Sequence, residues 1–142
     1  HMQTLLNRFA ISPDVLKEIL KYWKPVIYPA GKILLMEGSV SDKIFYVKSG
    51  LVRAYYYQGD QELTSWIVGE GDFAYSVESY HRQAPSPETI ETLERCELLY
   101  MTYADQQELL NIYPETNLIT RMLQENYLVL YDQRVRLLRG MD

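Results

Sequence analysis

The sequence predicts a mainly β fold with flanking helices: an antiparallel double-stranded β-helix, or jelly-roll barrel, with a short N-terminal helix and a long C-terminal helix. Between residues 32 and 73, apolar or alternating runs of strand length are separated by breaks that contain Gly with Asp or Ser. Such breaks are typical of turns, because these residues accept positive φ or bond their own backbone. The short, regularly spaced strands favour a barrel or jelly roll. After Met101 the hydrophobic spacing becomes helical.

The predicted strands follow one another so closely that they read as one long β-meander. The runs cover residues 32–38, 43–50, 51–57, 62–68 and 69–73, with a turn at residues 58–61. Alternating or continuous apolar character within each run is the strand signal. We therefore expect β structure throughout residues 24–103.

A short helix is predicted before the β region. Ser12 is followed by Pro13 and Asp14. This is a favourable helix start, because the hydroxyl can cap, Pro suits the first turn and the acid lies near the positive helix end. Apolar residues at helical spacing then predict a helix over residues 13–23, with one face packed on the barrel.

The chain after the β region is predicted to be helical. Residues 102–105 match a capping box and begin one helix. Pro114 opens a longer helix, which we expect over about residues 115–139 with Gly140 as its stop. Positions on this helix step by four and three residues, which is the spacing of a heptad seam. The seam consists of Ile119, Leu123, Asn126, Leu130, Gln133 and Leu137.

Composition restricts the chain to a single domain over residues 1–142. The chain is 47% hydrophobic, and it has no apolar stretch near the ~20 residues that a membrane span needs. Its net charge is −5, and direct DNA binding by this domain is not expected, because nucleic-acid binding surfaces are basic. The single cysteine, Cys96, cannot form an internal disulfide, which fits a reducing cytoplasm. We expect a cytoplasmic protein that does not contact membranes.

Several short motifs carry a resemblance to a known family. They are Pro29-Ala-Gly-Lys, Glu37-Gly, Phe45-Tyr-Val-Lys-Ser-Gly50 and Gly71-Asp-Phe73. In order and spacing they resemble the cyclic-nucleotide-binding domain of the catabolite activator, or Crp-Fnr, family of transcription regulators, over about residues 16–138. The resemblance implies a jelly-roll sensor domain.

In the resembled family the helix equivalent to residues 115–139 pairs with its twin across a two-fold axis. We therefore expect a homodimer, with Leu123, Leu130 and Leu137 central to the interface. Asn126 and Gln133 would fix the register, since a buried amide prefers a partner amide. The alternative is that this helix lies on its own barrel.

The resemblance also implies a ligand site in the loop and helix after Phe73. In the family a Gly-Glu pair approaches the cyclic phosphate and the ribose, and an Arg clamps the phosphate, because an anion needs a fork of donors. On this sequence the Gly-Glu positions fall on Tyr75 and Ser76, and the Arg position falls at or near Ser86. The phosphate-binding cassette is therefore degenerate, and we expect no tight binding of cyclic AMP or cyclic GMP.

Other residues around this loop are candidates for a pocket. Arg82 could replace the clamp and Glu78 the ribose acceptor, although each is more simply a solvated loop charge. Ser86 could donate to a ligand or merely shape its turn. If the family geometry holds, Tyr127 and Tyr131 approach the pocket mouth from the long helix. The candidate pocket residues are Tyr75, Ser76, Glu78, Arg82, Ser86, Tyr127 and Tyr131.

These features predict the ligand-sensing or regulatory domain of a Crp-Fnr-like regulator. Its effector would be an unknown small molecule, unless Tyr75 and its neighbours fill the cavity. In the family a DNA-binding domain follows the long helix, and this chain stops at Asp142. We therefore expect DNA binding only through a domain missing from this chain. The alternatives are a ligand-free dimerisation module and a stand-alone sensor.

A cupin-like metalloenzyme is a further alternative, because cupins are also jelly rolls. Such enzymes need two or three His and a carboxylate around a metal. Apart from His1, which we attribute to a tag-cleavage remnant, only His81 is present. We therefore expect no enzyme activity, no catalytic residue, no metal and no cofactor.

Overall fold

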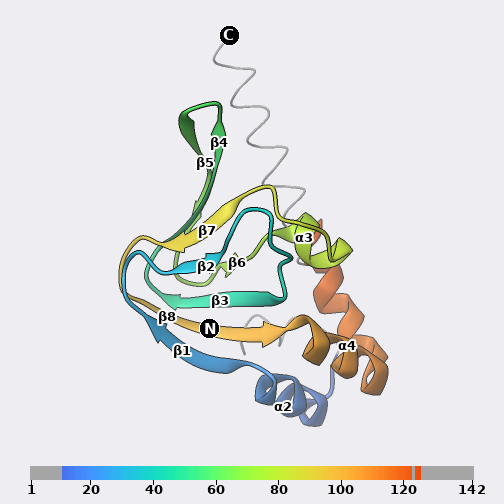
Figure 1. Ribbon diagram of the computed structural model, residues 1–142. Helices are drawn as coiled ribbons and strands as arrows, with labels where there is room; N and C mark the ends of the chain where they lie inside the picture. Colours follow the sequence, from blue (N-terminus) through green and yellow to red (C-terminus); the bar gives the residue numbers. More distant parts are fainter. Residues whose placement is uncertain (1–10, 123, 126–142) are drawn as a thin grey trace.

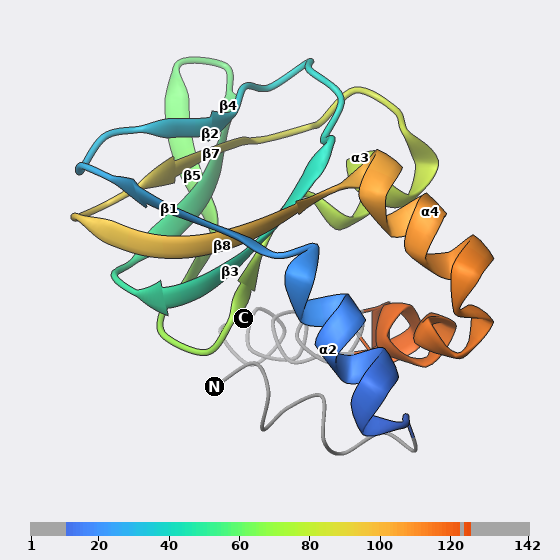
Figure 2. The ribbon, with the colours of Figure 1, turned by 90° about the horizontal axis from the view of Figure 1, so that it is seen from below.

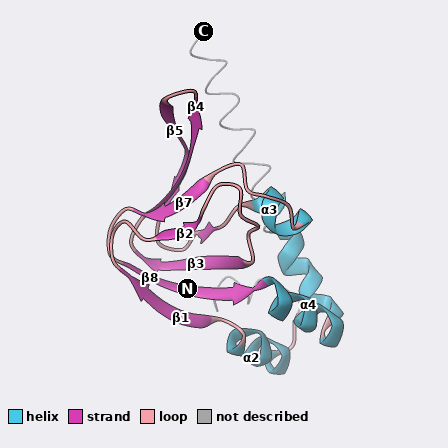
Figure 3. Ribbon diagram, in the orientation of Figure 1, coloured by secondary structure: helices cyan, strands magenta, loops and turns pink. Residues whose placement is uncertain are grey.

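The computed structural model describes residues 11–122 and 124–125, and these form two four-stranded antiparallel sheets flanked by helices (Figures 1 and 3). The first sheet has the order β1-β8-β3-β6, with β1 (Lys24–Tyr28), β8 (Cys96–Thr102), β3 (Lys43–Ser49) and β6 (Phe73–Ala74). The second has the order β2-β7-β4-β5, with β2 (Ile33–Leu35), β7 (Thr89–Thr92), β4 (Val52–Gln58) and β5 (Gln61–Val68). The predicted mainly β class is confirmed.

The central strand β3 explains the layering. Its residues 44–47 are all buried, because the first sheet is covered on both faces, and a strand covered on both faces reads as a continuous apolar run. Alternate side chains enter two cores. The inter-sheet core consists of Phe45, Val47, Val52, Ala54, Ala74, Ile90, Cys96 and Leu98. The helix-side core consists of Ile11, Leu16, Ile19, Trp23, Ile44, Tyr46, Tyr75, Tyr80, Met101 and Leu109.

The helices gather at one end of the two sheets (Figure 2). They are α2 (Pro13–Lys21), α3 (Val77–Arg82), α4 (Tyr103–Ile112) and the 3-10 turn η1 (Pro114–Thr116), after which residues 117–122 are helical. The two predicted N-terminal caps within the described residues are present. The Ser12 hydroxyl accepts a hydrogen bond from the backbone nitrogen of Val15 at 3.3 Å, and that of Thr102 accepts one from the nitrogen of Asp105 at 3.1 Å. Within the described residues, no helix has the length and apolar character needed to cross a membrane.

The predicted meander is wrong in its strand pairing. Consecutive strands β2 and β3 lie in different sheets, and β3 pairs with β8 and β6. Of the predicted meander, β4 and β5 do form a sequential hairpin, with Gln58 opposite Gln61 across the predicted turn. The hydrophobic pattern shows which faces of a strand are buried, and it does not show which strand lies beside it.

Two predicted boundaries are also wrong. The expected β structure over residues 24–103 is interrupted by α3, whose six residues are too few to show a helical period. The first helix ends at Lys21 instead of residue 23, and the nitrogens of Tyr22 and Trp23 then donate to the carbonyl oxygens of Ile19 and Leu20 at 3.1 and 3.3 Å.

Gly50 is required where β3 turns into β4. Its φ is +106°, which L side chains rarely adopt. A Cβ atom there would lie 2.5 Å from Sγ of Cys96 and 2.8 Å from the carbonyl oxygen of Arg95. Glycine therefore lets the β3–β4 connection pass directly over the start of β8.

The predicted dimer seam lies outside the described residues for five of its six positions. These are Leu123, Asn126, Leu130, Gln133 and Leu137. The sixth, Ile119, is partly buried and packs against the helix-side core.

Candidate functional site

Tyr75 occupies the start of the predicted ligand loop and points into the protein. It follows β6 directly and is only 6% exposed. Its ring packs edge-on against Tyr80, with centroids 5.5 Å apart, and against the ring of His81 at 5.8 Å. The Tyr75 hydroxyl shares a hydrogen bond of 3.2 Å with Nε2 of His81. Burial raises the pKa of Tyr75 and lowers the pKa of His81, so the uncharged forms of both are favoured.

The hollow that remains beside Tyr75 is very small. It has a volume of about 10 Å³, which is at the limit for one water molecule. Pockets for small ligands are typically about 300–1,000 Å³. The hollow is lined by Leu34, Leu35, Ser41, Asp42, Lys43, Phe45, Tyr75 and Ile90. This hollow, as it stands among the described residues, is too small for a nucleotide.

Glu78 and Arg82 pair with each other in solvent. Arg82 Nη1 lies 3.1 Å from Oε1 of Glu78, one helical turn away, and the two side chains are 75% and 60% exposed. Lys43, the one basic residue in the lining of the small hollow, lies 3.4 Å from Oδ1 of Asp42. Both cations therefore have an acidic neighbour, and neither is positioned as a free anion clamp.

Ser86 and Ser76 are both buried, and their contacts are with the protein backbone. The Ser86 hydroxyl donates to the carbonyl oxygen of Glu88 at 2.7 Å, and the Ser86 nitrogen donates to the carbonyl oxygen of Ser39 at 2.8 Å. Ser86 thus shapes the turn. Ser76 precedes α3, and its carbonyl oxygen accepts a bond from the Tyr80 nitrogen at 2.9 Å.

The structure brings Tyr75, Ser76, Glu78 and Arg82 together at α3, and it places Ser86 in the loop that follows. Tyr127 and Tyr131 lie outside the described residues. The two residues predicted on the long helix are therefore not placed relative to this group.

Sequence reasoning missed the polar residues that fasten α3 to the loop before β3. The Ser79 hydroxyl accepts a bond from the Ser41 nitrogen at 2.8 Å and donates to the carbonyl oxygen of Ala84 at 2.5 Å. Gln83 follows α3 with φ +50°, the left-handed conformation usually taken by Gly. Nothing in the local pattern marks Ser79. A helix stop without Gly is the only unusual feature at Gln83.

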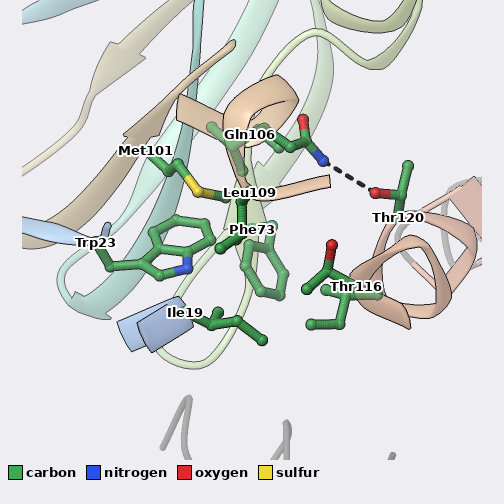
Figure 4. A pocket seen from close by; sticks show the side chains of 10 residues that line it. Ile19, Trp23, Phe73, Met101, Gln106, Leu109, Thr116 and Thr120 are labelled. Carbon is green, nitrogen blue, oxygen red and sulfur yellow. Dashed lines mark hydrogen bonds between the residues drawn. The ribbon is translucent and has the colours of Figure 1, made fainter. Parts of the chain in front are cut away.

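A second hollow lies in the helix-side core, on the face of the first sheet that the helices cover (Figure 4). Its volume is about 20 Å³, room for about one water molecule. Its lining is Ile19, Trp23, Ile44, Phe73, Met101, Gln106, Leu109, Thr116, Ile119 and Thr120. It adjoins three hydrogen-bonded polar side chains that sequence reasoning also missed. The Tyr80 hydroxyl donates to Oε1 of Gln106, and Nε2 of Gln106 donates to Oγ1 of the partly buried Thr120 at 3.0 Å. An isolated Gln or Thr on a predicted helix carries no signal of such a contact.

The described residues contain no group of three or more His, Cys, Asp or Glu side chains that could hold a metal ion. The buried groups at α3 are instead uncharged hydroxyl and imidazole groups packed against aromatic rings, and its charged side chains, Glu78 and Arg82, pair in solvent.

Comparisons with known proteins show which family this architecture belongs to. Residues 25–113 match the cyclic nucleotide-binding domain family. The catabolite activator protein of Thermus thermophilus is similar in structure, with a TM-score of 0.74 and 25% identity over 91% of this chain. This chain spans 61% of the length of that protein. A comparison with curated proteins finds no match.

Two more distant structures share the fold. The N-terminal domain of a transcriptional regulator from Streptomyces coelicolor A3(2) has a TM-score of 0.69 and 22% identity, over 88% of this chain and 87% of its own. The c-di-GMP responsive regulator CLP of Xanthomonas campestris has a TM-score of 0.67 and 20% identity, over 87% of this chain and 59% of its own.

The chain therefore belongs to the cyclic nucleotide-binding domain family. Within that family its structure resembles the sensor domains of transcription regulators related to the catabolite activator protein, and these relatives are regulatory domains rather than enzymes.

Proposed function

We propose that this chain is the ligand-sensing or regulatory domain of a Crp-Fnr-like transcription regulator, and that it does not bind cyclic AMP or cyclic GMP tightly. The observation that supports this most strongly is the position of Tyr75. Its side chain is buried where the family brings glycine backbone close to the phosphate, and it leaves about 10 Å³ beside it.

The charges around α3 support the same proposal. A bound cyclic phosphate needs a fork of donors. Ser86 lies at or near the family's Arg position, and its hydroxyl donates to the carbonyl oxygen of Glu88 within its own turn. Losing a charge-assisted contact to a buried anion removes about 1.5–3 kcal/mol. Loss of both the Arg and the Glu would weaken binding by roughly two to four decades.

The effector of such a domain would be an uncharged small molecule. Alternatively, the domain would respond through a rearrangement of the Tyr75 side chain without a ligand. The hollow is lined by apolar side chains, by Tyr75 and Ser41, and by the paired ions of Asp42 and Lys43. A ligand that enters would have to displace the Tyr75 ring and replace its bond to His81.

Assembly and DNA contact form a second part of the proposal. We propose that the chain forms a parallel homodimer through residues 115–139. We also propose that DNA is bound by residues beyond this sequence, and that the protein is cytoplasmic. The heptad seam supports the first point, and the net charge of −5 supports the second. The variant Leu130→Glu would bury two like charges in the seam and dissociate the dimer. Equal sedimentation masses for the variant and the parent would show that the seam is not the interface.

A thermal-stability series tests the ligand proposal. A ligand that binds only the folded state raises Tm. The chain is melted with cyclic AMP, cyclic GMP, cyclic di-GMP and a panel of uncharged metabolites. We expect no shift with millimolar cyclic AMP or cyclic GMP. A clear shift with micromolar cyclic AMP would overturn the proposal.

A further inference from the structure

Three hydrogen-bonded polar side chains, two of them buried, join α3 to the helical segment after η1, defined as residues 117–122. Tyr80 of α3 donates to Gln106 of α4, and Gln106 donates to Thr120 of this segment at 3.0 Å, which is the dashed contact in Figure 4. The side chains of Tyr80 and Gln106 are shielded from water, with exposures of 0% and 7%. The hydrogen bonds from Tyr80 to Gln106 and from Gln106 to Thr120 therefore link two helical elements that do not follow each other in sequence.

The Gln106 amide contacts both neighbours with opposite ends. Its oxygen accepts from Tyr80 and its nitrogen donates to Thr120. An amide group is planar, so a rotation that follows one partner moves the atom facing the other. Loss of either bond would leave a buried polar atom without a partner, and this is costly in a protein interior.

The apolar packing beneath the segment is incomplete. Ile119 and Thr120 of the segment line the hollow of about 20 Å³, together with Trp23 and Phe73. Figure 4 shows Thr120 on one side and Trp23 on the other. Side chains that line a void lose contacts on one side, so packing constrains the segment less there. The bond from Gln106 to Thr120 has a defined length and direction, and it therefore contributes strongly to the position of the segment.

We propose that Gln106 is a positioning residue that couples the placement of α3 to the placement of residues 117–122. A movement of Tyr75 and α3 would shift the Tyr80 hydroxyl. The Gln106 amide would follow this hydroxyl, and its hydrogen bond would then shift Thr120. This deepens the proposed function, because it names the route by which a change at the site would reach the C-terminal helix. The coupling itself operates in the chain without any ligand.

Hydrogen exchange of the intact 142-residue chain tests this, using near-isosteric variants that each remove one end of the link. Coupling between two sites is reciprocal. Tyr80→Phe is expected to speed amide exchange in residues 117–122 by about tenfold. Thr120→Val is expected to do the same for Val77–Arg82, far from the substituted position. Amides of β8 serve as the reference for global stability.

The matched control is Tyr103→Phe. The Tyr103 ring also packs edge-on against Tyr80, at 5.3 Å, and its hydroxyl takes no part in the Tyr80–Gln106–Thr120 chain. Tyr103→Phe should therefore leave amide exchange in residues 117–122 unchanged relative to exchange in β8. The proposal is overturned if each variant speeds exchange only in its own element, or equally throughout the protein. Binding of cyclic AMP by this chain would contradict the proposed function and leave this exchange pattern as it is.

Discussion

Gln83 and Ser41 are joined across 42 residues of sequence, because Nε2 of Gln83 donates to the carbonyl oxygen of Ser41 at 3.0 Å. The same nitrogen donates to the carbonyl oxygen of Tyr80 at 2.6 Å. These bonds fasten the end of α3 to the loop that leads into β3. Gln83 itself has a left-handed backbone conformation, which costs free energy for any residue with a side chain.

Substitution of Gln83 separates these two effects. Gln83→Ala keeps the backbone strain and loses the side-chain bonds, so we expect it to lower the free energy of unfolding by about 1–3 kcal/mol. Gln83→Gly loses the same bonds but relieves the strain, and it should cost less than the Ala variant. Urea denaturation of both variants measures the difference. A Gly variant less stable than the Ala variant would show that the strain is not significant.

Stability should depend on pH through His81. Burial lowers the pKa of His81 in the folded protein, so below about pH 6.5 the unfolded chain binds more protons than the folded one. The stabilising contribution of neutral His81 is therefore present above pH 6.5 and is lost as the pH falls through the folded pKa.

The measurement is the free energy of unfolding between pH 8 and pH 5 for the parent and for His81→Gln, which cannot be protonated. The parent should lose more stability than the variant over this interval. Parallel curves would mean that His81 titrates alike in both states. His1 is present in both proteins, and its contribution cancels.

Gly50 should tolerate substitution far less than Gly59. Ala at position 50 would place Cβ within 3 Å of Cys96 and of the Arg95 carbonyl, in addition to the strain at φ +106°. We expect Gly50→Ala to cost at least about 2 kcal/mol of unfolding free energy, from overpacking and strain together.

Gly59 is the matched control, because its φ is also positive, at +64°, and no atom lies within 4 Å of an added Cβ. Gly59→Ala should cost about 1 kcal/mol, from backbone strain alone. Similar losses for both variants, measured by urea denaturation, would contradict the role given to the close approach of Gly50 to β8.

The strands and helix caps could be predicted from sequence because their causes are local. The apolar run at residues 44–47 and the capping residues Ser12 and Thr102 are patterns that extend over only a few positions. The pairing of β3 with β8 could not be predicted, since partners as far apart in sequence as Lys43 and Thr102 leave no periodic signal. Helix α3 was missed for a related reason, because six residues show less than two helical turns.

The place of the candidate site is a prediction from sequence, whereas the geometry at that place could not be predicted. The motif that ends at Phe73 puts Tyr75 at the start of the predicted ligand loop. Its inward direction depends on Tyr80 and His81, whose rings form the wall against which it packs. The polar chain through Gln106 depends on three separate helical elements, and no pattern within one element indicates it.

The central claim is that Tyr75 and the altered cassette exclude cyclic AMP, and a calorimetric titration tests it most directly. The positive control is a variant that restores the family pattern, with Tyr75→Gly, Ser76→Glu and Ser86→Arg, and its melting curve must show that it folds. We expect no saturable heat from the parent and measurable binding by the variant. Sub-micromolar binding of cyclic AMP by the parent would contradict the account.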